Sequence, residues 1–333
     1  MLYALASRMP PSLAVILTGM YNVPPMKTNT LARRDFLRTL AAGTAVLYFP
    51  YRGFSQAPAS IQAMKLTDTI TMLSGDGGNI GVAVADDSIL MVDSGLAPRA
   101  NDLVKAVAEL SPRKVAILFN THFHFDHVGA NELLGKNGTK IMAHENVKKV
   151  LSMPFKDDAF ARTFDPLKPE GLPNATYTAG GKLTFGKNQV VYTHIAEAHT
   201  SGDTYVFFPE ANILQTGDLF WNGMYPVIDY SDKGWIGGMI AAADQMGKVG
   251  DANTRIIPGH GPLGTKADLK AFRDMLAKVH ERLEPMVKQG KTMEEVLAAA
   301  PTKDLDEKWG KPRPSEGFLR QAYPSLTRRN QKS

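Results

Sequence analysis

Residues 121–127 read Thr-His-Phe-His-Phe-Asp-His, and this run constrains the chain more than any other segment. It places three imidazoles and one carboxylate within six positions, and all are metal-ligand types. His122 and His124 are two residues apart, so in an extended segment their side chains point the same way. A turn after them would aim Asp126 and His127 at a neighbouring point. The simplest interpretation is two metal ions, one held by each pair.

A single histidine is more often a packed or surface residue than a ligand. Four ligand types at this spacing would be hard to satisfy without a metal. The 333 residues include no cysteine, which excludes disulfides, thiolate ligands, a cysteine nucleophile and an iron–sulfur cluster. Any metal must therefore be bound by nitrogen and oxygen, which suits Zn²⁺ and also Fe or Mn.

The formal charge of +5 belongs to the N-terminal segment. Residues 1–59 carry six basic groups and one acid, and the remaining chain has 32 groups of each sign. A neutral body gives no electrostatic basis for binding nucleic acid, so we expect no nucleic-acid partner.

We expect residues 1–59 to be an export leader and residues 60–333 to be the folded domain that carries the function. Residues 33–37, Arg-Arg-Asp-Phe-Leu, resemble the twin-arginine export motif. The apolar stretch at residues 39–49 has the length of a signal-peptide core and is too short to span a bilayer. Ala57 and Ala59 fit a cleavage site after Ala59. The predicted product is periplasmic or extracytoplasmic and has no stable membrane insertion after cleavage; an uncleaved anchor is the alternative.

Residues 1–25 fit such a leader poorly, because they hold a second apolar run and a proline pair. Met26 followed by Lys27 would make a normal leader start, so our hypothesis is that translation begins at Met26. Mass spectrometry of N-terminal peptides of the precursor tests this, since any peptide from residues 2–25 would contradict it.

The body alternates strand and helix patterns. We predict strands at residues 70–73, 80–85, 89–92, 115–119, 141–143, 182–185, 190–195, 205–208, 213–215 and 255–258. We predict helices at 98–110, from 131, at 235–249 and at 265–288, with a capping-box start to another at Thr292. Residues 153–178 contain four prolines and are interpreted as a surface insertion, with a flap over the site as one reading. Two strand-rich and helix-rich halves favour two sheets stacked face to face with helices outside.

Three further ligand candidates each follow a predicted strand: His199, Asp218 and His260. Strand ends are where open sheets place their ligands, and neighbouring glycines permit tight turns close to an ion. Each signal alone is weak, because Gly-Asp and Gly-His-Gly are usually ordinary turns. Together with the first cluster they give five histidines and two aspartates, a full set for two ions.

In this order, the seven residues resemble the metallo-β-lactamase superfamily, over roughly residues 66–280. The resemblance implies an α/β fold, a four-layer αββα sandwich with a two-metal site at one edge. It implies that His122, His124 and His199 hold one zinc ion, and that Asp126, His127 and His260 hold a second. It also implies that Asp218 bridges the two ions and that Asp93 orients a ligand histidine.

Differences between this chain and particular branches of the superfamily narrow the expected function. The best-studied β-lactamases have Cys or Ser where this chain has Asp218, and a bridging Asp is typical of glyoxalase II, lactonase and nuclease-like branches. His124 is not Glu, which argues against the diiron flavoprotein branch. The neutral body and the leader argue against the nuclease branches. The resemblance therefore favours an exported dizinc hydrolase of a small acyl substrate: an ester, thioester, lactone or β-lactam.

The mechanism that the resemblance implies uses a water shared by two Zn²⁺ ions, with its pKa lowered towards ~7, to attack a carbonyl carbon. Asp126 would help to orient this nucleophile. Asn222, Tyr225 and Lys233 follow Asp218 on a predicted loop facing the site. Tyr225 could donate a hydrogen bond to an oxyanion and Lys233 could pair with a substrate carboxylate; a packed loop with a solvated lysine is the alternative.

Two other function classes remain open. An iron oxidoreductase, like the persulfide dioxygenases of the superfamily, would use one iron and leave part of the second ligand set unused. A non-catalytic periplasmic binder of metal or metabolite would use the same residues without turnover.

Overall fold

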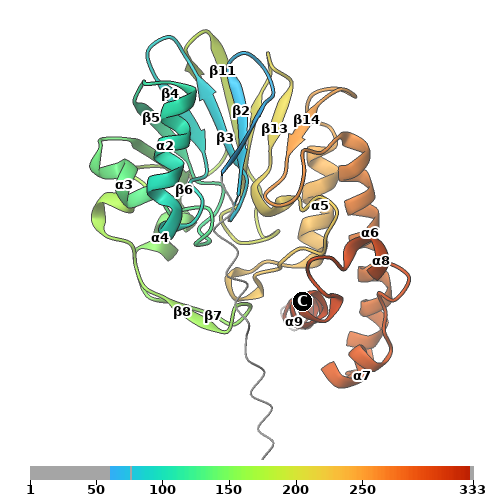
Figure 1. The fold of residues 1–333 in the computed structure, drawn as a ribbon. Coiled ribbons are helices and arrows are strands. Elements are labelled where there is room, and N and C mark those ends of the chain that lie inside the picture. Colours follow the sequence, from blue (N-terminus) through green and yellow to red (C-terminus); the bar gives the residue numbers. More distant parts are fainter. Residues whose placement is uncertain (1–60, 76, 331–333) are drawn as a thin grey trace, which may run out of the picture. The chain divides into compact units, whose positions relative to one another are not determined.

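The computed structural model describes residues 61–75 and 77–330, which form two β-sheets flanked by helices (Figure 1). The larger sheet has the strand order β1-β2-β3-β4-β5-β6-β9. Its strands are β1 (Gln62–Lys65), β2 (Ile70–Ser74), β3 (Ile80–Val84), β4 (Ile89–Val92), β5 (Val115–Phe119), β6 (Lys140–His144) and β9 (Ala175–Tyr177). Strands β1 to β4 pair antiparallel, whereas β4, β5, β6 and β9 run parallel.

The smaller sheet follows the chain from β10 to β14. Its strands are β10 (Gly181–Phe185), β11 (Asn188–His194), β12 (Thr204–Phe208), β13 (Ile213–Gln215) and β14 (Arg255–Ile257). Only the last pair, β13 and β14, is parallel. Strands β7 (Phe155–Asp157) and β8 (Arg162–Phe164) form a separate two-stranded unit, called the β7–β8 hairpin below.

The helices lie between and after these strands. They are α2 (Ala100–Leu110), α3 (Asn131–Lys136), α4 (Glu145–Leu151), α5 (Ile236–Met246), α6 (Lys266–Lys288), α7 (Met293–Ala298), α8 (Asp306–Trp309) and α9 (Ser315–Asn330), with short 3₁₀ turns η2 (Ala97–Arg99), η3 (Pro169–Gly171), η4 (Gly217–Leu219) and η5 (Tyr230–Asp232). Among the described helices, none is long and apolar enough to cross a membrane.

Three buried clusters order these elements into four layers. One cluster joins the inward faces of the two sheets and includes Phe119 of β5 and Val206 of β12. A second joins the outer face of the larger sheet to α2 and α3, and a third joins the smaller sheet to α5, α6 and α9 (Figure 1). Burial of apolar area on both faces of each sheet stabilises this arrangement. The predicted αββα sandwich is confirmed.

Most predicted elements form where their local signals place them. Strands β4, β5 and β13 have the predicted bounds, and α2 buries Leu103 and Val107 on its predicted apolar face. The predicted capping box of α7 is present, because Thr292 accepts from the backbone of Glu295 and the Glu295 side chain accepts in return.

The insertion differs from its prediction at its end. Residues 175–177 form β9, which pairs with β6 and belongs to the larger sheet rather than to a surface loop. Strand β1 and helices α4, α8 and α9 were not predicted, because their segments are short or carry weak periodicity. The predicted leader, residues 1–59, lies outside the described residues.

Candidate metal centre

The structure brings all seven predicted ligand residues to one place. Each follows a strand: the run at residues 122–127 follows β5, His199 lies between β11 and β12, Asp218 follows β13 and His260 follows β14. Their ligand atoms fall into two sets, each within 4.8 Å of one another. The first group is His122, His124, His199 and Asp218, and the second group is Asp126, His127 and His260.

Asp218 lies between the two groups and presents one carboxylate oxygen to each. Its Oδ2 is 3.8 Å from His122 Nε2 and 3.4 Å from His199 Nε2. Its Oδ1 is 3.0 Å from His127 Nε2 and 3.4 Å from His260 Nε2. A carboxylate shared between two cations would need one oxygen directed at each group, and Asp218 has this arrangement.

The backbone around Asp218 is shaped to fit this carboxylate. Gly217, just before it, has φ +51°, a left-handed conformation that favours glycine. A Cβ at Gly259 would lie 2.0 Å from Asp218 Oδ1 and 2.8 Å from its backbone nitrogen. Any side chain at residue 259 would therefore displace the carboxylate from the cluster.

Hydrogen bonds at the opposite ring nitrogens orient two histidines of the first group. His199 Nδ1 lies 2.9 Å from the Val227 carbonyl, which can only accept, so Nδ1 carries the proton. His122 Nδ1 lies 3.0 Å from Thr121 Oγ1, whose own hydrogen is donated to Asp93 Oδ2. His122 Nδ1 therefore donates as well. In both rings the Nε2 lone pair is left facing the cluster.

His124 uses its two nitrogens the other way round. Its Nε2 is 3.2 Å from Asp229 Oδ2, and its Nδ1 is 2.9 Å from His199 Nε2. With Asp229 accepting the Nε2 proton, the lone pairs of His124 and His199 face each other. Two facing lone pairs repel unless a cation lies between or beside them. Burial would lower the pKa of His124, but the hydrogen bond and charge of Asp229 raise it, so either a proton on His124 or a metal ion satisfies the two facing lone pairs.

Asp93 lies under the second group, in the left-handed conformation at φ 65°. Its Oδ2 accepts from His127 Nδ1 at 2.8 Å, and its two oxygens accept from the backbone and hydroxyl of Thr121 at 2.8 Å each. Burial raises the pKa of Asp93, although these donors and the His127 charge oppose the rise. Asp93 fixes the tautomer of His127 and connects the two groups through Thr121.

Several buried atoms of the cluster have no hydrogen-bond partner within the described residues. They are the Nε2 atoms of His122, His127 and His260 and the Oδ1 atom of Asp218. His127 Nε2 and His260 Nε2 lie at ion-pair distances from Asp218 Oδ1, 3.0 and 3.4 Å, so charge rather than well-aligned hydrogen bonds compensates these buried atoms. The donor set and its geometry therefore fit two divalent metal ions bound by nitrogen and oxygen.

The electrostatics favour the neutral form of two rings of the first group, His122 and His199. Burial lowers the pKa of His122 well below its ordinary value, and the neighbouring His127 adds to the effect. Burial likewise lowers the pKa of His199 to about 4, although the Asp218 charge opposes the shift. Neutral imidazole is the form that binds metal.

The second group has the opposite balance. Burial alone would lower the pKa of His260, but the carboxylates of Asp218 and Asp126 outweigh it and raise the pKa to about 9. Burial would raise the pKa of Asp126, but His127 and His260 lower it to about 2. Protons on the His127 and His260 rings balance the charge of these carboxylates, so a metal ion that binds this group would release protons.

Solvent reaches the centre from the second group. The side chains of Asp126 and His260 are 15% and 18% exposed, whereas the other ligand side chains are at most 3% exposed. Trp221 covers part of this edge, since its ring stacks on His260 at 4.0 Å between centroids. Small molecules from solvent would therefore reach the ligand atoms beside Asp126, His260 and Trp221.

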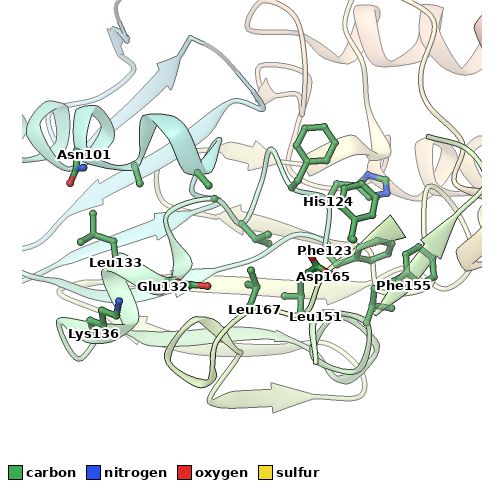
Figure 2. A pocket seen from close by; sticks show the side chains of 17 residues that line it. Asn101, Phe123, His124, Glu132, Leu133, Lys136, Leu151, Phe155, Asp165 and Leu167 are labelled. Atoms are coloured by element: carbon green, nitrogen blue, oxygen red, sulfur yellow. The ribbon is translucent and has the colours of Figure 1, made fainter. Parts of the chain in front are cut away.

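A cavity with a mostly apolar lining lies beside His124, and neither Asp126, His260 nor Trp221 lines it (Figure 2). It has a volume of about 460 Å³ and is lined by α2, α3, α4, the β7–β8 hairpin and the loop at residues 120–130, called the metal-binding loop below. Phe123, Leu151 and Phe155 are among its apolar residues. His124 alone of the seven ligands lines it, and both ring nitrogens of His124 face other groups. The cavity therefore does not present metal-facing atoms to a ligand.

The β7–β8 hairpin packs on the metal-binding loop through aromatic rings. Phe160, at the hairpin turn, lies 5.1 Å from the His124 ring and 5.7 Å from Phe125. Phe164 stacks on Phe125 at 5.7 Å, and Arg162 lies over Phe164 at 4.3 Å. The insertion thus covers one side of the loop, as the flap reading of residues 153–178 anticipated.

The three residues predicted to bind substrate lie in three different surroundings. Asn222 lies beside the centre, where its backbone nitrogen donates to the His260 carbonyl at 2.9 Å. The prediction for Tyr225 is wrong: its ring is fully buried and its hydroxyl donates to Asp306 at 2.9 Å, so it is committed to core packing. Lys233 is exposed and lines a separate surface hollow with Trp235 that contains none of the seven ligands.

Sequence reasoning missed Asp229 and Arg313. Asp229 is fully buried and holds His124, but it follows Asp218 by 11 residues in a loop with no pattern. Arg313 lies in the segment before α9 and stacks over Trp221. No local signal marks either residue, because both are defined by contacts across the chain.

A helix–sheet–sheet–helix fold with a His/Asp cluster at the strand ends defines a class of metal-binding α/β proteins. The sequence matches the family described as "Metallo-beta-lactamase superfamily" over residues 73–274. The chain belongs to this superfamily, whose members are mostly metal-dependent hydrolases.

Two solved structures show the same fold. A metallo-beta-lactamase from Pontibacter korlensis aligns with a TM-score of 0.56 and 16% identity, covering 65% of this chain and 99% of that one. The DIM-1 metallo-beta-lactamase aligns with a TM-score of 0.53 and 17% identity, covering 66% and 98%. At these identities the likeness shows the fold alone. Both matches leave about a third of this chain unaligned.

Proposed function

We propose that this chain is a metal-dependent hydrolase that binds two ions, with zinc the best fit, and cleaves an acyl bond in a small molecule. The substrate would be an ester, thioester, lactone or β-lactam. The observation that carries the proposal is Asp218, whose two oxygens face two separate groups of ligand atoms. Nitrogen and oxygen donors in sets of three and four suit zinc, with Fe or Mn as alternatives.

Two bound ions would supply Lewis-acid polarisation of a carbonyl and a water activated near neutral pH. Residues of this chain would orient the attacking water and the ligand rings. Asp126 is held ionised by its histidine neighbours, its pKa being about 2, and its carboxylate at the solvent edge can accept a hydrogen bond and orient an attacking water. Asp93 and Asp229 hold their ligand rings in fixed orientations by hydrogen bonds.

A hydrolysis screen with metal analysis on the same sample tests the proposal. We expect about two zinc ions per chain, hydrolysis of at least one acyl class, and loss of activity with a chelator that zinc reverses. Metal-loaded protein that hydrolyses no ester, thioester, lactone or β-lactam would contradict it. Iron in the isolated protein with oxygen uptake on a persulfide would favour an oxidoreductase instead.

We also propose that the protein works outside the cytoplasm, exported by a twin-arginine signal at Arg33 and Arg34. The paired arginines, the apolar stretch after them and the small residues before Ser60 support this. Cell fractionation of the wild type and the double Arg33→Lys, Arg34→Lys variant is the test. We expect an exported product starting at Ser60 and retention of the variant; unchanged export of the variant would refute the proposal.

A further inference from the structure

The C-terminal segment, residues 306–330, packs directly on the loop that follows Asp218. The Tyr225 backbone nitrogen donates to the Trp309 carbonyl at 2.9 Å, and its ring stacks on Phe318 at 4.9 Å with an interplanar angle of 8°. Its hydroxyl donates to Asp306. These contacts hold α8 and α9 against the loop that follows Asp218, and the short stretch between the two helices lies outside the region that matches the family.

Within this stretch, Arg313 reaches the solvent edge of the centre through a stack of three side chains. Its guanidinium lies over Trp221, with Cζ 5.6 Å from the ring centroid. Trp221 in turn stacks on His260 at 4.0 Å. Burial lowers the pKa of Arg313, while the charge of Asp218 opposes the shift, so the guanidinium senses the carboxylate at the heart of the cluster.

Arg313 has no polar partner among the described residues. Its Nε is buried without a hydrogen bond, and no carboxylate pairs with its guanidinium. Trp221 Nε1 is also buried without a partner. Other arginines of the C-terminal region are paired, Arg282 with Asp304 and Arg320 with Glu316. A partly buried guanidinium left unpaired is costly and calls for an anion.

Arg313 is also held in place before any ligand binds. It lies between Pro312 and Pro314, whose rings restrict the backbone on both sides. Its guanidinium lies over the Trp221 ring, and its N–H groups make no hydrogen bond among the described residues, so they are free to donate. The N–H edge of a guanidinium matches the planar, two-oxygen geometry of a carboxylate.

We propose that Arg313 binds a carboxylate of the substrate, with the scissile acyl group placed over Asp126 and His260. The substrate class is then an acyl compound that carries a second, free carboxylate. This inference rests on the proposed hydrolase function and assigns to Arg313 the role predicted for Lys233. Trp221 forms the wall between the carboxylate site and the metal centre.

Matched esters test the proposal. The 4-nitrophenyl monoester of glutaric acid and 4-nitrophenyl pentanoate have the same acyl chain length and differ in a terminal carboxylate against a methyl group. Arg313→Gln should raise KM for the glutarate ester about 10- to 100-fold, as loss of a charged hydrogen-bonded pair does, with little change in kcat. KM for pentanoate should stay within about twofold. The succinate and adipate monoesters then show which spacing between the scissile acyl group and the free carboxylate the site prefers.

Two variants separate recognition from folding. Arg320→Gln removes the same charge from an exposed, paired arginine of α9 and should leave both esters unchanged. Arg313→Lys keeps the charge and should recover part of the KM for the glutarate ester, because a lysine cannot reproduce the fork geometry. A merely structural Arg313 would alter both esters alike, and that result would overturn the proposal.

A binding measurement keeps the inference independent of catalysis. Glutarate is titrated into metal-free protein, and the ¹⁵N–¹H signal of Arg313 Nε, assigned by its loss in Arg313→Gln, is followed by NMR. We expect a saturable shift of this signal. If wild-type protein hydrolyses neither ester, the screen across acyl classes still decides the hydrolase proposal, and this titration alone decides the role of Arg313. An unmoved signal refutes that role.

Discussion

The two ligand groups share Asp218 but differ in their surroundings. The first group is sealed: its rings are at most 1% exposed and are held by a backbone carbonyl, by Thr121 and by the buried Asp229. The second group is open at Asp126 and His260, which carry strongly shifted pKa values and border Trp221. If the centre binds two ions as we propose, the first group would hold its ion more tightly and the second would be the one that solvent and substrate reach.

Asp218→Asn should have the largest effect, because it weakens metal binding at both groups at once. The amide keeps the shape but loses the charge and one acceptor oxygen. Loss of orienting partners alone costs 10–100-fold in such sites, so we expect activity to fall at least about 10²-fold and metal content to drop below one ion per chain. Metal analysis and hydrolysis rates measure this. The exposed Asp244, changed to Asn, is the matched control; full metal occupancy in Asp218→Asn would contradict the bridge.

His260→Ala and His199→Ala compare the groups directly. We expect His260→Ala to keep about one tightly bound ion, because the first group retains all its ligands, and to lose roughly 10²-fold in activity. His199→Ala should lose the tight ion. Competition with a coloured chelator gives both affinities. Equal losses in the two variants would show that the groups do not differ as their burial indicates.

Asp93→Asn probes the support under the second group. Asp93 Oδ2 accepts the proton of His127 Nδ1, and an amide could present its nitrogen there instead and favour the wrong tautomer. We expect a 10- to 100-fold loss of metal affinity at the second group, with the first group less affected. An affinity change confined to the first group would refute this assignment.

Asp157, on the β7–β8 hairpin, should give the smallest effect and a pH signature. Burial, and then the charge of Asp229, raises its pKa to about 6. A raised carboxyl pKa means that the folded state holds the proton more tightly. The stability this contributes is present at low pH and is lost as pH rises from about 4 through about 6.

Urea unfolding of metal-free protein at pH 4.5 and pH 7 checks this. Relative to Asp157→Asn, the wild type should lose stability between the two pH values, and the exposed Asp165→Asn should follow the wild type. An identical pH dependence in wild type and Asp157→Asn would show that Asp157 titrates as an ordinary carboxyl group.

The strands β4, β5 and β13 could be predicted from short apolar runs bounded by turn residues, and α6 from its length and periodicity. The weak elements could not: β9 is three residues long and becomes a strand only by pairing with β6. The surroundings of Tyr225 could not be predicted from the sequence either. Its position after Asp218 suggested a substrate contact, but packing against Phe318 turned it into the core.

The sequence by itself determined the chemistry of the centre. Ligand types in a fixed order, each after a strand, specify nitrogen and oxygen donors at one sheet edge, because strand ends of a packed sandwich converge. Tertiary structure alone decided what surrounds those donors. Asp229 behind His124, the hairpin over Phe125 and Arg313 beside Trp221 come from segments far apart in the chain. Only packing brings them together, since no local pattern encodes a contact between distant residues.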